Sequence, residues 1–128
     1  MPAPDSTLLL LIVEDDLVVL HLCQRVLERE GYRVLAASDG YEALQLAPLP
    51  AEISLALVDV VLPKMSGSSL VDRLRGGGMA GAVMWMSGYP FGELPVLTER
   101  EWFLPKPFTP RQLIEAVEEA LKKRGVDP

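Results

Sequence analysis

The chain has 128 residues, of which 49% are hydrophobic and 23% charged, so it predicts one packed domain and excludes a disordered chain. A net charge of −6 argues against direct nucleic-acid binding, which needs clustered lysine and arginine. The longest apolar run, residues 8–13, is too short to span a bilayer, so no membrane segment is expected.

The first predicted elements are a strand over residues 8–14 and a helix over residues 18–30. The strand is continuously apolar, which is typical of a strand buried on both faces of a sheet. Gly31 follows the helix as a plausible C-cap. The apolar face of the helix is predicted to consist of Val19, Leu22, Cys23 and Val26.

A second strand is predicted over residues 33–37 and a third over residues 53–59. Between them, Asp39 precedes Glu42 by three residues, which is the spacing of a capping box. We therefore expect a short helix to begin after Asp39 and to end at Pro48. Strands and helices alternate up to this point of the chain.

The third helix is predicted to begin at a serine, either Ser66 or Ser68, because serine is a favoured N-cap. The glycine run at 76–78 stops this helix, and a fourth strand follows over residues 82–87. The alternation of strand and helix is thus maintained. The apolar residues of the third helix are Leu70, Val71 and Leu74.

The segment after the fourth strand, residues 89–100, contains two prolines and little periodicity. It predicts a short or irregular fourth helix and the least ordered part of the domain. A fifth strand is expected over residues 101–104, and Thr109, Pro110 and Gln112 suit the first positions of a last helix. The apolar face of that helix is Leu113, Ala116, Val117, Ala120 and Leu121.

Strands that alternate with helices predict an α/β fold with a parallel sheet covered on both faces. We expect a single domain over 1–128, with a core over about 8–123. The lone cysteine, Cys23, excludes an internal disulfide and fits a reducing compartment. Residues 1–7 lack the positive charge of a signal peptide, so the expected location is cytoplasmic.

Polar side chains stand at the ends of four predicted strands. Glu14 and Asp15 end the first run, Asp59 ends the third and Ser87 ends the fourth, whereas Lys106 comes just after the fifth. The C-terminal ends of parallel strands meet at one edge of the sheet, where ligands of open α/β sheets bind. Carboxylates, a hydroxyl and an ammonium gathered there suit phosphoryl transfer assisted by a divalent cation.

Four short motifs carry a resemblance to a known family. They are LIVEDD at 11–16, LVDVVLPKMSG at 57–67, MSGY at 86–89 and LPKPF at 104–108. In this order, at successive strand ends, they resemble the receiver domain of bacterial response regulators, which act in two-component signalling. The resemblance covers nearly the whole chain and implies a flavodoxin-like (βα)5 three-layer sandwich with strand order 2-1-3-4-5.

The resemblance implies that Asp59 is the phosphoacceptor, whose carboxylate attacks a phosphoryl group and forms an acyl phosphate. A solvated aspartate at a strand end is the plainer interpretation, but Pro63 and Gly67 follow Asp59 as they do in receivers. A phosphatase of the haloacid-dehalogenase type would need a second aspartate where this chain has Val61. We therefore expect no enzyme activity beyond the domain's own phosphorylation and dephosphorylation.

Glu14 and Asp15 match the acidic pair of the family, which implies a Mg²⁺ site. Clustered carboxylates repel one another, and a divalent cation relieves that repulsion. The implied ligands are Asp15, Asp59 and the backbone carbonyl of Val61. Glu14 is expected to act through a water molecule, and Asp16 to cap the first helix instead.

The remaining site residues are implied by their matched motifs. Ser87 would hydrogen-bond a phosphoryl oxygen, and Lys106 would form an ion pair with it. The Lys106–Pro107 bond resembles one that is cis in receivers. Phe103 takes the position of a switch aromatic that is tyrosine in many members. Without a hydroxyl Phe103 can act only by packing, and a plain core aromatic is the alternative.

The expected function is that of a phosphoacceptor module that switches a surface for an unknown downstream protein. Its donor would be a histidine kinase or a histidine phosphotransfer protein. The alternative is a pseudo-receiver that works without phosphorylation, and the intact set of Asp15, Asp59, Ser87 and Lys106 argues against it. The SGY and LPKPF motifs are similar to those of receivers in hybrid histidine kinases, and a stand-alone receiver stays open.

Overall fold

The computed structural model describes residues 8–47, 49–88 and 100–122. Its five strands form one parallel sheet in the order β2-β1-β3-β4-β5, which confirms the predicted topology. All strand bounds lie within one residue of the predicted ranges. The strands are β1 (Leu9–Val13), β2 (Arg33–Ala37), β3 (Ile53–Asp59), β4 (Ala82–Ser87) and β5 (Glu101–Pro105).

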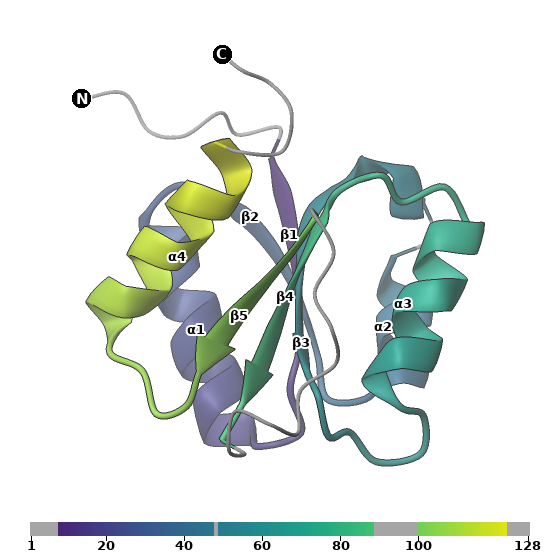
Figure 1. Ribbon diagram of the computed structural model, residues 1–128, viewed down its shortest axis with the longest axis horizontal. Coiled ribbons are helices and arrows are strands. Elements are labelled where there is room, and N and C mark those ends of the chain that lie inside the picture. Colours follow the sequence, from purple (N-terminus) through teal and green to yellow (C-terminus); the bar gives the residue numbers. More distant parts are fainter. Residues whose placement is uncertain (1–7, 48, 89–99, 123–128) are drawn as a thin grey trace.

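Four helices and one short 3-10 turn are described around the sheet: α1 (Leu17–Arg29), α2 (Gly40–Leu46), η1 (Pro50–Glu52), α3 (Gly67–Gly76) and α4 (Pro110–Lys122). Figure 1 shows three layers, with α1 and α4 on one face of the sheet and α2 and α3 on the other. The fourth helix predicted within 89–100 falls on residues 89–99, outside the described part of the chain. No described helix has the length and apolar character that a bilayer crossing needs.

Side chains along each strand alternate between the two helical layers. In β1, Leu9, Leu11 and Val13 belong to the core beneath α2 and α3. Leu10 and Ile12 belong to the core beneath α1 and α4. Both faces of the strand are therefore buried, which explains why its sequence is a continuous apolar run instead of an alternating one.

Each of the four described helices has a side-chain cap at its N-terminus. Asp16, Asp39 and Ser66 each accept a backbone hydrogen bond from the first turn of α1, α2 and α3. Ser66 is therefore the start of the third helix, and Ser68 is not. Thr109 and Gln112 form the predicted capping box of α4, with reciprocal bonds of 3.1 and 2.8 Å. These caps determine where the loops at the C-terminal edge of the sheet end.

The buried face of α1 overlaps the predicted one, because Cys23 is buried and Val19 and Val26 pack against the core, and only Leu22 of the predicted set lies outside it. Of the predicted set, Leu22 is 47% exposed, whereas Val19 and Val26 are only partly buried. The apolar residues of α1 form a broad stripe opposite the polar residues His21, Gln24 and Glu28, so the periodicity indicates the apolar side of the helix but not which part of that side is buried. Packing against the sheet and α4 makes the selection. The buried residues of α1 are Leu20, Cys23 and Leu27.

Candidate functional site

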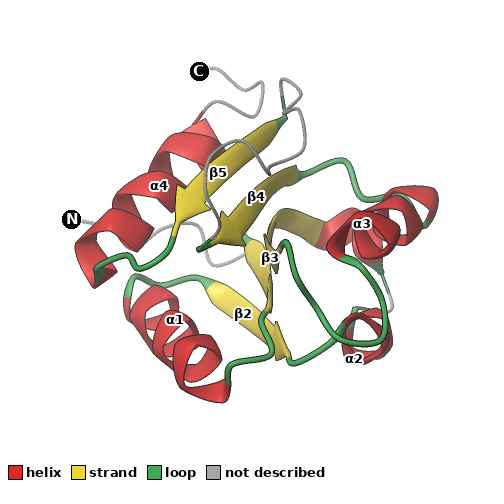
Figure 2. Cartoon of the chain, turned by 60° about the horizontal axis from the view of Figure 1, so that its bottom comes forward, coloured by secondary structure: helices red, strands yellow, loops and turns green. Residues whose placement is uncertain are grey.

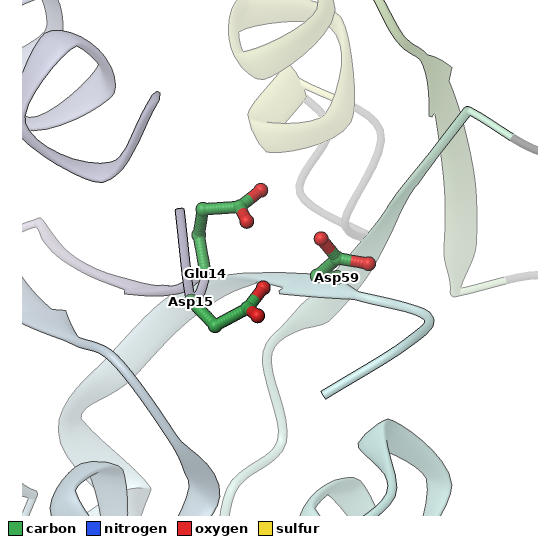
Figure 3. Close-up of side chains that lie close together, drawn as sticks. All are labelled: Glu14, Asp15 and Asp59. Carbon is green, nitrogen blue, oxygen red and sulfur yellow. The ribbon is translucent and has the colours of Figure 1, made fainter. Parts of the chain in front are cut away.

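The C-terminal edge of the sheet gathers polar side chains from three strands, and Figure 2 turns this edge towards the reader. Glu14 and Asp15 follow β1, Asp59 ends β3, and Lys106 follows β5. The three carboxylates face a common space (Figure 3), with one oxygen of each within 4.8 Å of the others. The structure thus brings together acidic residues that lie more than 40 positions apart in the sequence.

Lys106 connects two of these carboxylates. Its Nζ lies 2.5 Å from Glu14 Oε1 and 2.7 Å from Asp59 Oδ2. Backbone amides hold the remaining oxygens, because Asp59 Oδ1 accepts a 2.9 Å hydrogen bond from Val61 and Glu14 Oε2 accepts one of 2.9 Å from Asp16. Both carboxylates are therefore fixed at two points before any ligand arrives.

Burial and the neighbouring opposite charges shift the pKa values of Glu14 and Lys106 in opposite directions. Glu14 is only 1% exposed, and burial raises its pKa although the hydrogen bond from Lys106 lowers it. Burial also lowers the pKa of Lys106, but its hydrogen bonds to Asp59 and Glu14 outweigh that effect and leave the pKa raised. Lys106 is therefore firmly protonated at neutral pH.

The donor set fits a hard divalent cation, which prefers carboxylate and carbonyl oxygens. With all four groups ionised, the three carboxylates and one ammonium carry a net charge of −2, which such a cation neutralises. Asp15 is exposed and Asp59 is 7% exposed, so one ligand faces solvent and one lies inside. The carbonyl of Val61 and a water-mediated role for Glu14 stay predictions.

The two predicted switch residues occupy neighbouring strands. Ser87 ends β4, is 2% exposed, and accepts a 2.8 Å hydrogen bond from the Lys106 amide through its backbone carbonyl. Phe103 lies in β5 opposite Trp85 and packs, partly buried, against the core beneath α2 and α3. The structure therefore places Ser87 at the acidic edge and Phe103 further into the sheet. The Lys106–Pro107 bond is cis, as predicted.

The loop between β3 and α3 makes two contacts that the sequence did not predict. Lys64 Nζ lies 3.4 Å from Asp39 Oδ2, and Met65 packs on Gly40. The first pair is separated by 25 positions, so no local pattern marks it. Only the positive φ of Lys64, 70°, is a local sign that this loop is constrained, and it is visible in the backbone alone.

An apolar and basic surface adjoins the acidic edge. A hollow of about 450 Å³ beside Lys106 is lined by Val19, Leu22, Gly88, Lys106, Pro107 and Phe108. A second hollow of about 400 Å³ shares Leu22 and is lined by Val18, His21, Leu22, Arg25, Val26 and Arg29. We call these two sets of residues together the α1 surface. Val18 is 78% exposed, so this surface is open to a partner.

The chain is similar to known proteins over most of its length. A family model described as "Response regulator receiver domain" matches residues 10–118. The sensor kinase CckA of Brucella abortus (strain 2308) is 36% identical over 118 residues, which are 89% of this chain and 12% of that protein. The transcriptional regulatory protein CpxR of Escherichia coli (strain K12) is 33% identical over 116 residues, 89% of this chain and 49% of CpxR. The chain spans less than half the length of these curated relatives.

Solved structures agree with the family match. The crystal structure of the receiver domain from the hybrid histidine kinase CckA has a TM-score of 0.76 and 37% identity, and covers 88% of this chain and 98% of that one. A response regulator receiver domain protein from Clostridium thermocellum has a TM-score of 0.79 and 25% identity, covering 91% and 96%. With most of its length matched in sequence and in fold, the chain belongs to the response regulator receiver domain family.

Proposed function

We propose that this domain is a phosphoacceptor in which Asp59 takes a phosphoryl group from a phosphohistidine. The supporting observation is the environment of Asp59. One oxygen of its carboxylate meets the Lys106 ammonium, the other meets the Val61 amide, and two further carboxylates lie close by. Membership of the receiver family of two-component systems supports the same role.

In the proposed step, the Asp59 carboxylate attacks phosphorus in line with the leaving nitrogen. The new O–P bond makes an acyl phosphate, and the N–P bond breaks with its electron pair going to the imidazole. The imidazole leaves neutral when its other nitrogen carries a proton. Lys106 supplies positive charge for the phosphoryl oxygens, and the Ser87 hydroxyl donates a hydrogen bond to one of them.

Mg²⁺ is the proposed cofactor, held by Asp15, Asp59 and the Val61 carbonyl, with Glu14 acting through water. When bound, the ion supplies positive charge that stabilises the phosphoryl oxygens as charge develops on them. The net charge of −2 among the carboxylates and Lys106 supports this choice. Lys106 alone leaves two carboxylate charges uncompensated.

The proposed phosphodonor is a histidine kinase or a histidine phosphotransfer protein. Such a partner must bring its histidine close to Asp59, so it has to contact the surface next to Lys106. The α1 surface begins there and continues through the exposed Leu22 to Arg25 and Arg29. We assign it to the donor, with apolar residues facing Leu22 and acidic residues facing the two arginines.

Phosphorylation would then alter a surface for a downstream protein. The added phosphoryl group carries charge and acceptor oxygens that draw Ser87, and Phe103 repacks in the space that Ser87 leaves. The change biases an existing equilibrium between two states. We treat residues 1–128 as one cytoplasmic domain with a core over about 8–123. It has no other enzyme activity and no nucleic-acid contact of its own.

Intact mass measured after incubation with Mg²⁺ and acetyl phosphate tests the proposal. Wild type should gain one phosphoryl group, and Asp59→Asn should gain none. Asp72→Asn, which changes an exposed aspartate of α3, is the matched control and should behave as wild type. An adduct that persists in Asp59→Asn would show that another residue accepts the phosphoryl group. Wild type that accepts no phosphoryl group from acetyl phosphate or any histidine kinase would favour a pseudo-receiver.

A further inference from the structure

The loop between β3 and α3, residues 60–66, has a constrained backbone next to Asp59. The amide of Val61 in this loop donates the 2.9 Å hydrogen bond to Asp59 Oδ1, so the loop helps to position that carboxylate. Lys64 has a φ of 70°, in the left-handed region that residues other than glycine seldom adopt. Such a conformation persists only where surrounding structure holds it in place.

The N-terminus of α2 provides one such contact through Asp39. Asp39 Oδ2 lies 3.4 Å from Lys64 Nζ, while Asp39 Oδ1 accepts a 2.8 Å hydrogen bond from the Glu42 amide and caps α2. The hydrogen bond from Glu42, and then the one from Lys64, lower the pKa of Asp39. One carboxylate therefore ties the loop to the beginning of a helix.

Gly40, the first residue of α2, provides the second contact by packing on Met65. A Cβ at position 40 would lie 2.8 Å from Met65 Sδ and 3.3 Å from Met65 Cβ. The sulfur can rotate away, but Met65 Cβ moves only with the loop backbone. Met65 is 7% exposed within the core beneath α2 and α3, so it has little room to retreat.

We propose that Asp39 and Gly40 are positioning residues that hold the β3–α3 loop in the geometry that the Mg²⁺ site requires. The inference rests on the proposed function, because Val61 of this loop is a proposed metal ligand. Lys64 is 66% exposed, and ion pairs with an exposed partner stabilise little. The Gly40–Met65 contact therefore carries the larger share of the effect.

Gly40→Ala tests the inference, with Gly76→Ala as the matched control. Both exchange a glycine of a helix, but a Cβ at position 76 meets nothing within 4 Å. Two readouts are used, the Mg²⁺ dissociation constant from calorimetric titration and the Val61 amide chemical shift in metal-free protein. Gly40→Ala should weaken Mg²⁺ binding about tenfold, as is typical when support behind a metal ligand is lost, and should shift the Val61 amide. Gly76→Ala should leave both unchanged.

Two more variants separate the contacts. Adding Met65→Ala to Gly40→Ala removes Met65 Sδ and Cγ, which lie 2.8 and 3.4 Å from the new methyl group, and leaves only Met65 Cβ at 3.3 Å. Mg²⁺ affinity should therefore return part of the way to the wild-type value. Asp39→Asn keeps a good helix cap but loses the charge that pairs with Lys64. It should weaken Mg²⁺ binding by only about twofold to threefold, and it replaces Gly40→Ala if that variant does not fold.

An unchanged Val61 amide and unchanged Mg²⁺ affinity in folded Gly40→Ala would overturn the inference, as would an equal loss in Gly76→Ala. A wild-type protein that binds no Mg²⁺ would count against the proposed function instead. The Val61 shift in metal-free Gly40→Ala then decides the inference by itself, because that readout needs no metal.

Discussion

The Lys106 ammonium lies 2.7 Å from the Asp59 carboxylate, across 47 positions of the sequence. The same ammonium pairs with the buried Glu14 at 2.5 Å. A positive charge is therefore already in place where the proposed acyl phosphate would add negative charge. A group that is oriented before the reaction does not have to be reorganised during it.

Lys106→Met should destabilise the protein by about 1–3 kcal/mol in the absence of divalent cations, because it leaves buried carboxylate charge without a partner. Urea unfolding in the presence of a chelator measures the change in the free energy of unfolding. Lys122→Met removes an exposed lysine at the end of α4 and should cost less than about 0.5 kcal/mol. Equal losses in both variants would show that the ion pairs of Lys106 contribute nothing.

Mg²⁺ should raise the melting temperature, because it binds a carboxylate cluster that exists only in the folded protein. At a free concentration ten times the dissociation constant, the gain is about 1.4 kcal/mol by mass action. Asp15→Asn should lose most of this gain, whereas Asp72→Asn should keep it. A wild-type melting temperature that is unchanged by millimolar Mg²⁺ would show that this site does not bind the ion.

Cys23 should make stability fall at alkaline pH. Burial, and then the charge of Glu14, raise the pKa of its thiol from 9.0 to about 11. Between these values the unfolded chain releases the proton while the folded one keeps it, so the free energy of unfolding decreases as pH rises. The loss from pH 8 to pH 10 is about 1 kcal/mol for this group.

Urea unfolding of wild type and Cys23→Ala under reducing conditions measures that loss as a difference. Other groups that titrate at alkaline pH, including the buried Tyr32, affect both proteins equally, so their contributions cancel in the difference. The variant should therefore lose about 1 kcal/mol less than wild type between the two pH values. If the free energy of unfolding falls equally with pH in wild type and Cys23→Ala, the thiol has the same pKa in the folded and unfolded states.

Ser87→Ala should uncouple Phe103 from the phosphoryl site. With beryllofluoride as a phosphoryl mimic, amide chemical shifts of residues 101–108 should change in wild type and change less in the variant. The wild-type change should be modest, because Phe103 has no hydroxyl and gains only packing. Ser54→Ala alters another buried serine, in β3, and serves as the control. Identical shifts in wild type and Ser87→Ala would exclude coupling through this serine.

Leu22→Glu should slow phosphorylation by a protein donor about tenfold or more, because it places a charge in the α1 surface. The probe is a purified histidine kinase that phosphorylates wild type in a kinetic screen. Acetyl phosphate, which needs no docking surface, should phosphorylate the variant normally. Leu49→Glu changes another exposed leucine, 60% exposed, and should leave both reactions unchanged. A normal rate for Leu22→Glu with the kinase would place the donor elsewhere.

Strand and helix positions could be predicted because their signals are local. The continuous apolar run of β1 and the capping boxes at Asp39 and Thr109 lie within a few residues of the elements that they define. The meeting of Glu14 and Asp59 at one edge followed from the parallel alternation alone. Their separation, and the ammonium shared between them, required the three-dimensional structure.

The sequence by itself determined the fold class, the strand order implied by its motifs, and which residue types stand at the strand ends. Only the tertiary structure decided which part of the broad apolar stripe of α1 is buried, because that stripe is wider than the area covered by the sheet and α4, and Leu22 is left exposed. It also decided that Lys64 meets Asp39 and that Met65 lies on Gly40. Contacts of this kind join segments far apart in the chain, so they depend on how whole elements pack, and no local pattern in the sequence marks the pairing.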